Sequence, residues 1–142
     1  SLKYIDVDGG NGIGVAGSLA INDSFFMELS LDDIEEADRS TVAFGFHNPI
    51  NDTTDFYTKA FYQHFDTDFG SYSITGLALG VRSMVSDRVE LGANWQYVDI
   101  EDEGSDDQFN LSAGVFVTDS LFLNLDYGTE DEITQLALRF DI

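Results

Sequence analysis

His64 and its neighbours are the residues whose types could carry out hydrolysis. Ser71 and Ser73 follow it closely, and Asp66 and Asp68 lie between them. A serine that is activated by a histidine, itself oriented by a carboxylate, is the arrangement that performs acyl transfer. The spacing here is loose, and a polar histidine at the rim of a fold is the simpler interpretation. We therefore assign no catalytic residue and keep the hydrolase as an alternative.

A dense acidic group near residue 100 is a second candidate. Clustered carboxylates are hard oxygen ligands that suit Ca²⁺ or Mg²⁺. No EF-hand spacing is present, so we predict a solvated, repelling surface with divalent cations bound only loosely, no dedicated metal site and no cofactor. The group consists of Asp99, Glu101, Asp102, Glu103, Asp106 and Asp107.

The composition excludes several classes of function. The chain has 142 residues, with 27 Asp and Glu against 6 Lys and Arg, and a formal net charge of −21. Nucleic acid is excluded as a partner because phosphate binding needs clustered basic residues. The absence of cysteine excludes disulfides and thiolate metal sites. The length suits a single domain over residues 1–142, and the apolar runs are too short for a transmembrane helix.

Alternation of apolar and polar residues is the main structural signal. It is clear over residues 89–97, 109–117 and 121–127, and a period of two predicts β-strands with two unlike faces. Four times, an aliphatic residue is followed by a short polar residue, then Asp, then Ser, Thr or Arg, which predicts tight hairpin turns. These turns lie at Ile21, Asn22, Asp23 and Ser24; at Ile50, Asn51, Asp52 and Thr53; at Val85, Ser86, Asp87 and Arg88; and at Val117, Thr118, Asp119 and Ser120.

Between these turns lie segments that are longer and acidic, which we predict as loops over residues 32–39, 66–70, 101–107 and 128–132. Short and long connections therefore alternate. Five ascending and five descending strands follow, an all-β, closed, antiparallel up-and-down barrel of ten strands with both termini on the short-turn side; eight strands is the alternative. The ascending strands end on a common row of Tyr4, Leu31, Tyr62, Tyr97 and Tyr127, with Trp95 one outward position below Tyr97.

The two faces of the strands indicate a barrel in a membrane. One face is apolar, and the opposite face gathers charged and small residues. A soluble barrel needs an apolar interior, whereas a membrane barrel places its apolar face against lipid and closes so that every backbone group is bonded. We therefore predict an aromatic row at the membrane interface (Tyr4, Tyr62, Trp95, Tyr97 and Tyr127) and an ion-pair network in the lumen (Glu28, Lys59, Arg82, Glu90, Asp126 and Arg139).

The lumen is predicted to be largely occluded. Ten strands leave only modest room inside a barrel, and the aromatic residues on the inward parity would fill much of it. The ion pairs are interpreted as a structural plug, with a gate or narrow ion path as the alternative, and His47 as a hydrogen-bonded lumen residue. The inward aromatic residues are Phe26, Tyr57, Phe61, Phe116 and Phe122.

The C-terminal segment alternates in the same way, with Leu136, Leu138, Phe140 and Ile142 on one face. Together with the ten strands, the Asp-containing turns and the tyrosine row, it resembles the small outer-membrane β-barrels of Gram-negative bacteria, the OmpA/OmpX-like or opacity-type porin superfamily. The resemblance implies a cleaved signal peptide, insertion into the outer membrane with lipopolysaccharide as its neighbour, and no catalytic residue. We also predict that the barrel is a monomer. Those proteins usually end in Phe or Trp, so Ile142 departs from the pattern.

Two further functions remain open on the sequence alone. One is a lipid-modifying enzyme in which His64 at the membrane rim would deacylate lipid A. The other is a soluble ligand-binding barrel, which would need its leucines to point inward. The favoured interpretation is a barrel with a structural, surface-interaction or narrow-channel role. The soluble alternative needs Leu79, Leu91, Leu111, Leu123 and Leu138 inside.

Overall fold

The computed structural model describes residues 1–7, 10–35, 37–129 and 134–140, and places ten β-strands among them. No helix in this described part is long and apolar enough to cross a membrane. The strands are β1 (Leu2–Val7), β2 (Gly10–Ala20), β3 (Phe25–Ile34), β4 (Ala37–Asn51), β5 (Thr54–Thr67), β6 (Gly70–Met84), β7 (Val89–Ile100), β8 (Gly104–Thr118), β9 (Leu121–Gly128) and β10 (Thr134–Phe140).

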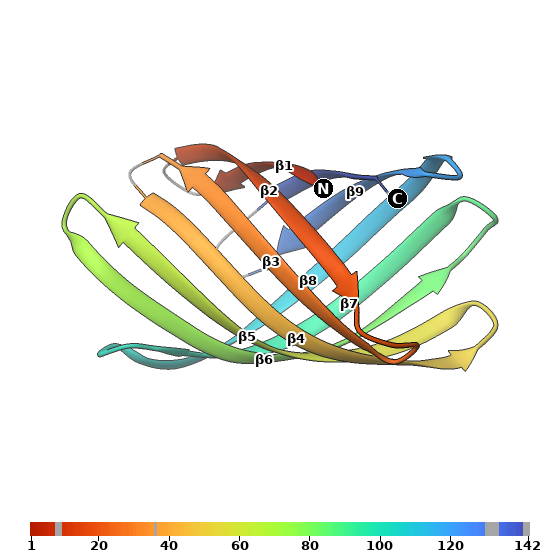
Figure 1. The fold of residues 1–142 in the computed structure, drawn as a ribbon, viewed down its shortest axis with the longest axis horizontal. Helices are drawn as coiled ribbons and strands as arrows, with labels where there is room; N and C mark the ends of the chain where they lie inside the picture. The colour runs from red at the N-terminus through yellow and green to blue at the C-terminus, as the bar shows by residue number, and fades with distance from the viewer. Residues whose placement is uncertain (8–9, 36, 130–133, 141–142) are drawn as a thin grey trace.

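The ten strands form one closed barrel in which each strand pairs with its neighbours in sequence (Figure 1). Every pairing is antiparallel, and β1 closes the barrel on β10, from Leu2 opposite Leu138 to Asp6 opposite Thr134. The predicted ten-stranded barrel is confirmed and the eight-stranded alternative is wrong. Closure leaves no edge strand, so the backbone of each strand has partners on both sides.

The four predicted turns are present at one end of the barrel, the right-hand end in Figure 1. In each of them, the short polar residue before Asp accepts a hydrogen bond from a backbone N–H that follows it. Asn22 Oδ1 accepts from the N–H of Ser24 at 2.9 Å, and Asn51 Oδ1 accepts from that of Thr53 at 3.0 Å. Ser86 and Thr118 do the same through their hydroxyl oxygens. We call this the turn end.

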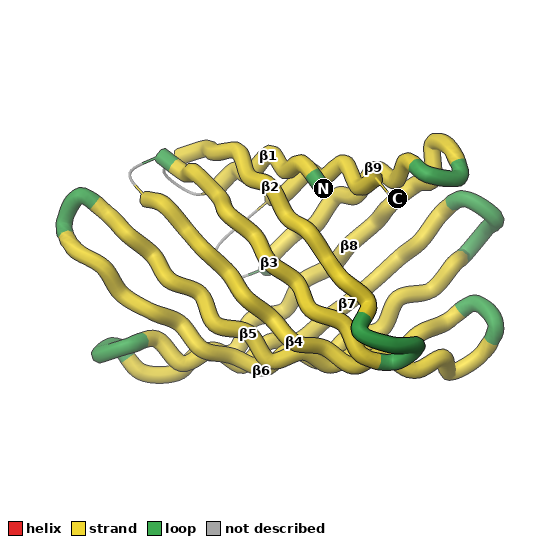
Figure 2. The backbone as a smooth tube through the Cα atoms, in the orientation of Figure 1, coloured by secondary structure: helices red, strands yellow, loops and turns green. Residues whose placement is uncertain are grey.

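The opposite end, which we call the acidic end, differs from the prediction of long loops. β5 and β6 run on to Thr67 and Gly70, and β7 and β8 to Ile100 and Gly104, so short connections join long strands (Figure 2). The acidic residues mostly lie in strands that extend past the aromatic row, because alternation and antiparallel pairing continue there. The predicted loop over 128–132 and the terminal Ile142 lie wholly or partly outside the described residues.

The inward and outward parities follow the predicted assignment. Exposed large apolar residues such as Leu29, Leu79 and Leu91 alternate with half-buried or buried residues on the inner wall. The leucines that a soluble barrel needs inside are all on the outside, so that alternative is wrong. Part of the inner wall is apolar, a patch over β4 to β7 formed by Ala43, Phe61, Ala78 and Val98, with Ile74 against it.

Candidate functional site

Two ion pairs lie on the inner wall of the barrel, on β3, β5 and β6. Lys59 Nζ is 3.0 Å from Glu28 Oε2, and Arg82 Nη2 is 3.2 Å from Asp55 Oδ2. Their side chains keep part of their surface open: 39% for Glu28, 27% for Lys59, 39% for Arg82 and 32% for Asp55. A closed, side-chain-filled interior would bury them, so space for water reaches these pairs.

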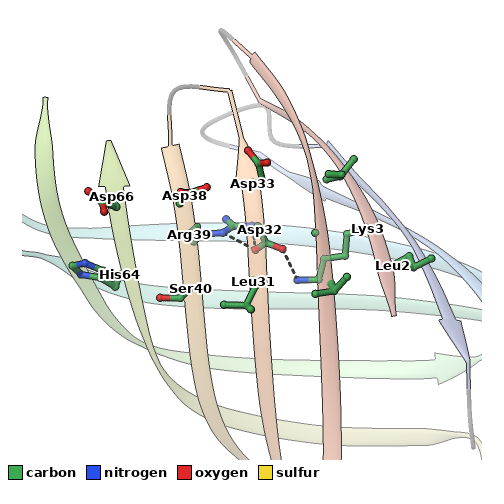
Figure 3. A pocket seen from close by; sticks show the side chains of 13 residues that line it. Leu2, Lys3, Leu31, Asp32, Asp33, Asp38, Arg39, Ser40, His64 and Asp66 are labelled. Carbon is green, nitrogen blue, oxygen red and sulfur yellow. Dashed lines mark hydrogen bonds and ion pairs between the residues drawn. The ribbon is translucent and has the colours of Figure 1, made fainter. Parts of the chain in front are cut away.

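A third ion cluster lies inside the wall nearer the acidic end, level with the aromatic row. The Asp32 side chain is completely buried between two cations, with Arg39 Nη2 at 2.8 Å and Lys3 Nζ at 3.5 Å (Figure 3). The Asp32 carboxylate lies against Gly14 on β2, and a Cβ at position 14 would overlap Asp32 Oδ1. Glycine at position 14 therefore allows β1, β3 and β4 to share one buried charge cluster.

Aromatic rings extend this cluster around the inner wall. The Arg39 guanidinium lies 5.9 Å from the centre of the Phe65 ring. The Phe65 ring is stacked on Tyr72, with centroids 4.8 Å apart and planes within 2°. The two ion pairs, the contact between Arg39 and the Phe65 ring, and the ring stacking together form a chain of contacts from β1 to β6. We call its residues the outer belt: Lys3, Asp32, Arg39, Phe65 and Tyr72.

Four other inward aromatic rings lie over glycines on neighbouring strands instead of crossing the lumen. Directly paired residues show this: Phe26 covers Gly45 and Phe61 covers Gly76. At each glycine, a Cβ would overlap the ring. Since each ring occupies the room of a missing side chain, it takes up less of the lumen than the sequence suggested. Tyr57 lies over its direct partner Gly80, and Phe122 lies over Gly114, two residues from its direct partner Phe116.

Uncharged amides line the wall over β7, β8 and β9. Asn94 Oδ1 accepts hydrogen bonds from Gln96 Nε2 at 3.0 Å and from Asn110 Nδ2 at 3.1 Å. Asn124 Nδ2 donates to Asp126 Oδ2 at 2.6 Å. All five side chains are half-buried and lie on the inward parity of their strands.

The structure brings together only part of the predicted lumen network. Glu28 and Lys59 form a pair, whereas Arg82 pairs with Asp55 and Asp126 accepts a hydrogen bond from Asn124. Arg139 lies over the rings of Phe122 and Phe116, with its Cζ 4.6 Å and 6.0 Å from their centroids. Glu90 lies on the inward parity of β7, half-buried.

Three charged lumen residues were missed by sequence reasoning, namely Asp32, Arg39 and Asp55. The first two fall in the predicted loop over residues 32–39, but the inward parity of Glu28 and Ser30 continues two residues further along β3 to Asp32. Asp55 shares the inward parity of Tyr57 and Lys59 on β5. Extending the alternation by one more period in each strand is the signal that could have found them.

The residues of the predicted interface row all point outward. Tyr4, Tyr62, Trp95, Tyr97 and Tyr127 are exposed on the outer wall of β1, β5, β7 and β9. Aromatic residues with one apolar and one polar end favour the boundary between lipid and water.

His64 lies on the outer wall of β5, near the acidic end. Its Nδ1 is 3.2 Å from Ser73 Oγ, and the same oxygen is 2.9 Å from Tyr62 Oη. Asp66 lies further along β5, opposite Ser71. The structure therefore brings His64 to Ser73, where Tyr62 shares the hydroxyl. His47 lies inside, as predicted, with its ring centroid 6.1 Å from that of Phe26. The predicted hydrogen bond is not present at its Nδ1, which is buried without a partner among the described residues.

The acidic group near residue 100 surrounds the β7–β8 hairpin, where all six carboxylates are exposed. Asp102 and Gly104 have positive φ angles of 65° and 107°, which let the chain reverse there. Among the described residues, no three or more His, Asp or Glu side chains are arranged to hold a metal ion.

Comparison with known proteins identifies a family for this chain. Residues 2–116 match the family model of the outer membrane protein beta-barrel domain. The chain belongs to this family. Members are outer-membrane β-barrels, which agrees with the closed barrel, its apolar outer wall and the resemblance predicted from the sequence.

Solved structures of porins share the family's fold with this chain. A NanC porin matches with a TM-score of 0.67 and 5% sequence identity, covering 100% of both chains. A KdgM porin matches with a TM-score of 0.62 and 8% identity, covering 99% of this chain and 97% of that one. At such low identity the likeness concerns the fold alone. No curated protein matches the chain.

Proposed function

We propose that this outer-membrane barrel is a narrow passive channel whose lumen is largely, but not completely, occluded by side chains. The observation that carries the proposal is the partial exposure of the Glu28–Lys59 and Asp55–Arg82 pairs inside the barrel. Because these lumen side chains are partly exposed to solvent, they imply a path for water between the turn end and the middle of the wall.

The outer belt is the narrowest part in this proposal. Asp32 has no exposed side-chain surface, and Ile5, Ile34 and Val98 are also buried toward the acidic end. Charged groups that are buried and paired hold their side chains in fixed positions. The belt therefore restricts passage by size and leaves the rest of the lumen wider.

The remaining parts of the proposal concern location and partners. Removal of a signal peptide gives the mature protein. The mature protein inserts as a monomer, and lipopolysaccharide surrounds its aromatic row. Its acidic end faces the exterior of the cell and holds divalent cations loosely between its carboxylates and lipid phosphates. No catalytic step is assigned, because Ser73 Oγ is shared between His64 and Tyr62.

Conductance of the purified chain, folded into a planar bilayer, tests the channel. Small, steady openings that scale with salt concentration are expected. Stable insertion without any conductance would overturn the channel and favour a structural or surface-interaction role. Mass spectrometry of lipid A incubated with the protein tests the rim enzyme separately, and loss of an acyl chain would establish the enzyme in its place.

A further inference from the structure

The charges inside the barrel balance, although the chain as a whole is strongly acidic. Among the described residues, ten charged side chains are buried or half-buried, and all ten lie on the inward parity. Five are basic and five are acidic. Every other described Asp, Glu, Lys or Arg is exposed. The inner set consists of Lys3, Arg39, Lys59, Arg82 and Arg139 with Glu28, Asp32, Asp55, Glu90 and Asp126.

The basic groups of the inner set are also engaged locally. Lys59, Arg82 and Arg39 each have a carboxylate within 2.8 to 3.2 Å. Lys3 shares Asp32 with Arg39, and Arg139 lies over two aromatic rings. A solute that passes therefore meets neither a row of cations nor a row of anions. An ion entering this lumen therefore meets cations that already have partners and gains no row of counter-charges.

Amide groups and an aromatic ring supply the binding capacity that remains. Each amide can donate two hydrogen bonds and accept two, and the contacts within the Asn94, Gln96 and Asn110 cluster use only part of this capacity. The Tyr57 ring covers Gly80, which is paired with Asn94 on β7. A wall that offers donors, acceptors and an apolar ring side by side matches molecules that carry hydroxyl groups on a carbon skeleton.

The two ends of the barrel oppose anions. All but one of the exposed charged residues in the described part of the chain are acidic, the exception being Arg88 in a turn. Negative potential at both entrances lowers the local concentration of anions. Cations are attracted to the entrances, but the neutral lumen gives them no continuing path of carboxylates.

We propose that the solutes of this channel are small, uncharged, hydroxyl-rich molecules, of the polyol or monosaccharide class, and that the Asn94, Gln96 and Asn110 amides bind them in passage. This inference rests on the proposed channel function. Anionic saccharides are excluded as solutes, in contrast to the oligogalacturonate in one KdgM porin structure that has the same fold.

Osmotic swelling of proteoliposomes tests the proposal with three solutes of the same ring size. Glucose is neutral, glucuronate is anionic, and glucosamine is cationic in a mildly acidic buffer. Glucose is expected to enter several-fold faster than either charged relative. Entry of none of the three would overturn the channel itself. Equal or faster entry of a charged sugar would overturn the inference and leave the channel standing.

Two substitutions test whether the amide cluster sets the selectivity among these sugars. Asn94→Leu removes the group that joins Gln96 and Asn110, and glucose entry is expected to fall. Asn110→Asp places one carboxylate in the same space, so glucosamine entry should rise relative to glucuronate. Asn48→Leu and Asn48→Asp are matched controls because Asn48 is exposed on the outer wall. Folding of each variant is checked by gel mobility in detergent. A folded barrel resists the detergent until the sample is heated, and its mobility then shifts.

The outcomes for these variants are distinct. Slower glucose entry through folded Asn94→Leu, with Asn48→Leu unchanged, supports binding at the amides. Unchanged glucose entry through Asn94→Leu, or an unchanged ratio of charged sugars through Asn110→Asp, would overturn it. If Asn94→Leu does not fold, the isosteric Asn110→Asp variant decides.

Discussion

The Tyr57 ring lies directly over Gly80 on the neighbouring strand, in a register where the two residues face each other. A Cβ on Gly80 would overlap the ring carbon Cζ and the hydroxyl oxygen. The ring therefore rests on the wall because position 80 has no side chain. Glycine in the interior of a strand usually marks such a close approach.

Gly80→Ala should displace the Tyr57 ring into the lumen and destabilise the barrel. Overpacking of this kind typically costs about 1–3 kcal/mol. Urea unfolding of the protein in lipid vesicles measures the change. Gly17→Ala is the control, because a Cβ at Gly17 meets nothing within 4 Å, and it should be neutral or stabilising by up to about 1 kcal/mol. Equal stability of the two variants would show that the ring does not depend on Gly80.

Asp32→Asn should destabilise the acidic end, because it leaves two largely buried cations, Lys3 and Arg39, facing a neutral amide. Removing one partner of a buried ion pair costs about 3–5 kcal/mol. Asp33→Asn is the control on the next residue, which is exposed on the outer wall, and its effect should stay within about 0.5 kcal/mol. The same unfolding measurement compares them, and similar midpoints would argue against the charge cluster.

The sequence predicted the number of strands, the turns and the two faces because each depends on local pattern. Alternation gives the faces, and a short polar residue before Asp gives a turn whatever the rest of the chain does. The pairing of Glu28 with Lys59 could also be anticipated, since both residues share the inward parity and carry opposite charges.

The outer belt and the flat aromatic rings could not be predicted in the same way. Asp32 follows Leu31 in a segment rich in carboxylates, and this composition resembles a loop more than a strand. Whether Phe61 crosses the lumen or lies on the wall depends on Gly76 being its cross-strand partner, a relation of register between β5 and β6. Register is a property of the closed barrel and is not visible in either strand alone.

If the proposed channel conducts, Lys59→Gln should change its selectivity toward cations. It leaves Glu28 without its partner at 3.0 Å and gives the lumen one net negative charge. Reversal potentials in a salt gradient across a planar bilayer measure this shift, and the open-channel conductance should rise as well. Arg88→Gln is the matched control, because it also removes one cation but from an exposed turn. An equal shift in both variants would mean that net charge alone, and not the pair, sets selectivity.

Leu91→Arg should prevent stable insertion into a bilayer. Leu91 is exposed on the outer wall of β7, opposite Ala113 on β8, and an arginine on the lipid face costs about 2–4 kcal/mol at the membrane midplane. Leu123→Arg on β9 should act in the same way, whereas Leu91→Phe keeps the surface apolar and should insert normally. Folding yield in lipid vesicles, read from the shift in gel mobility on heating, separates these variants. Normal insertion of both arginine variants would contradict the assignment of the outer wall to lipid, because either substitution places a charge among hydrocarbon chains.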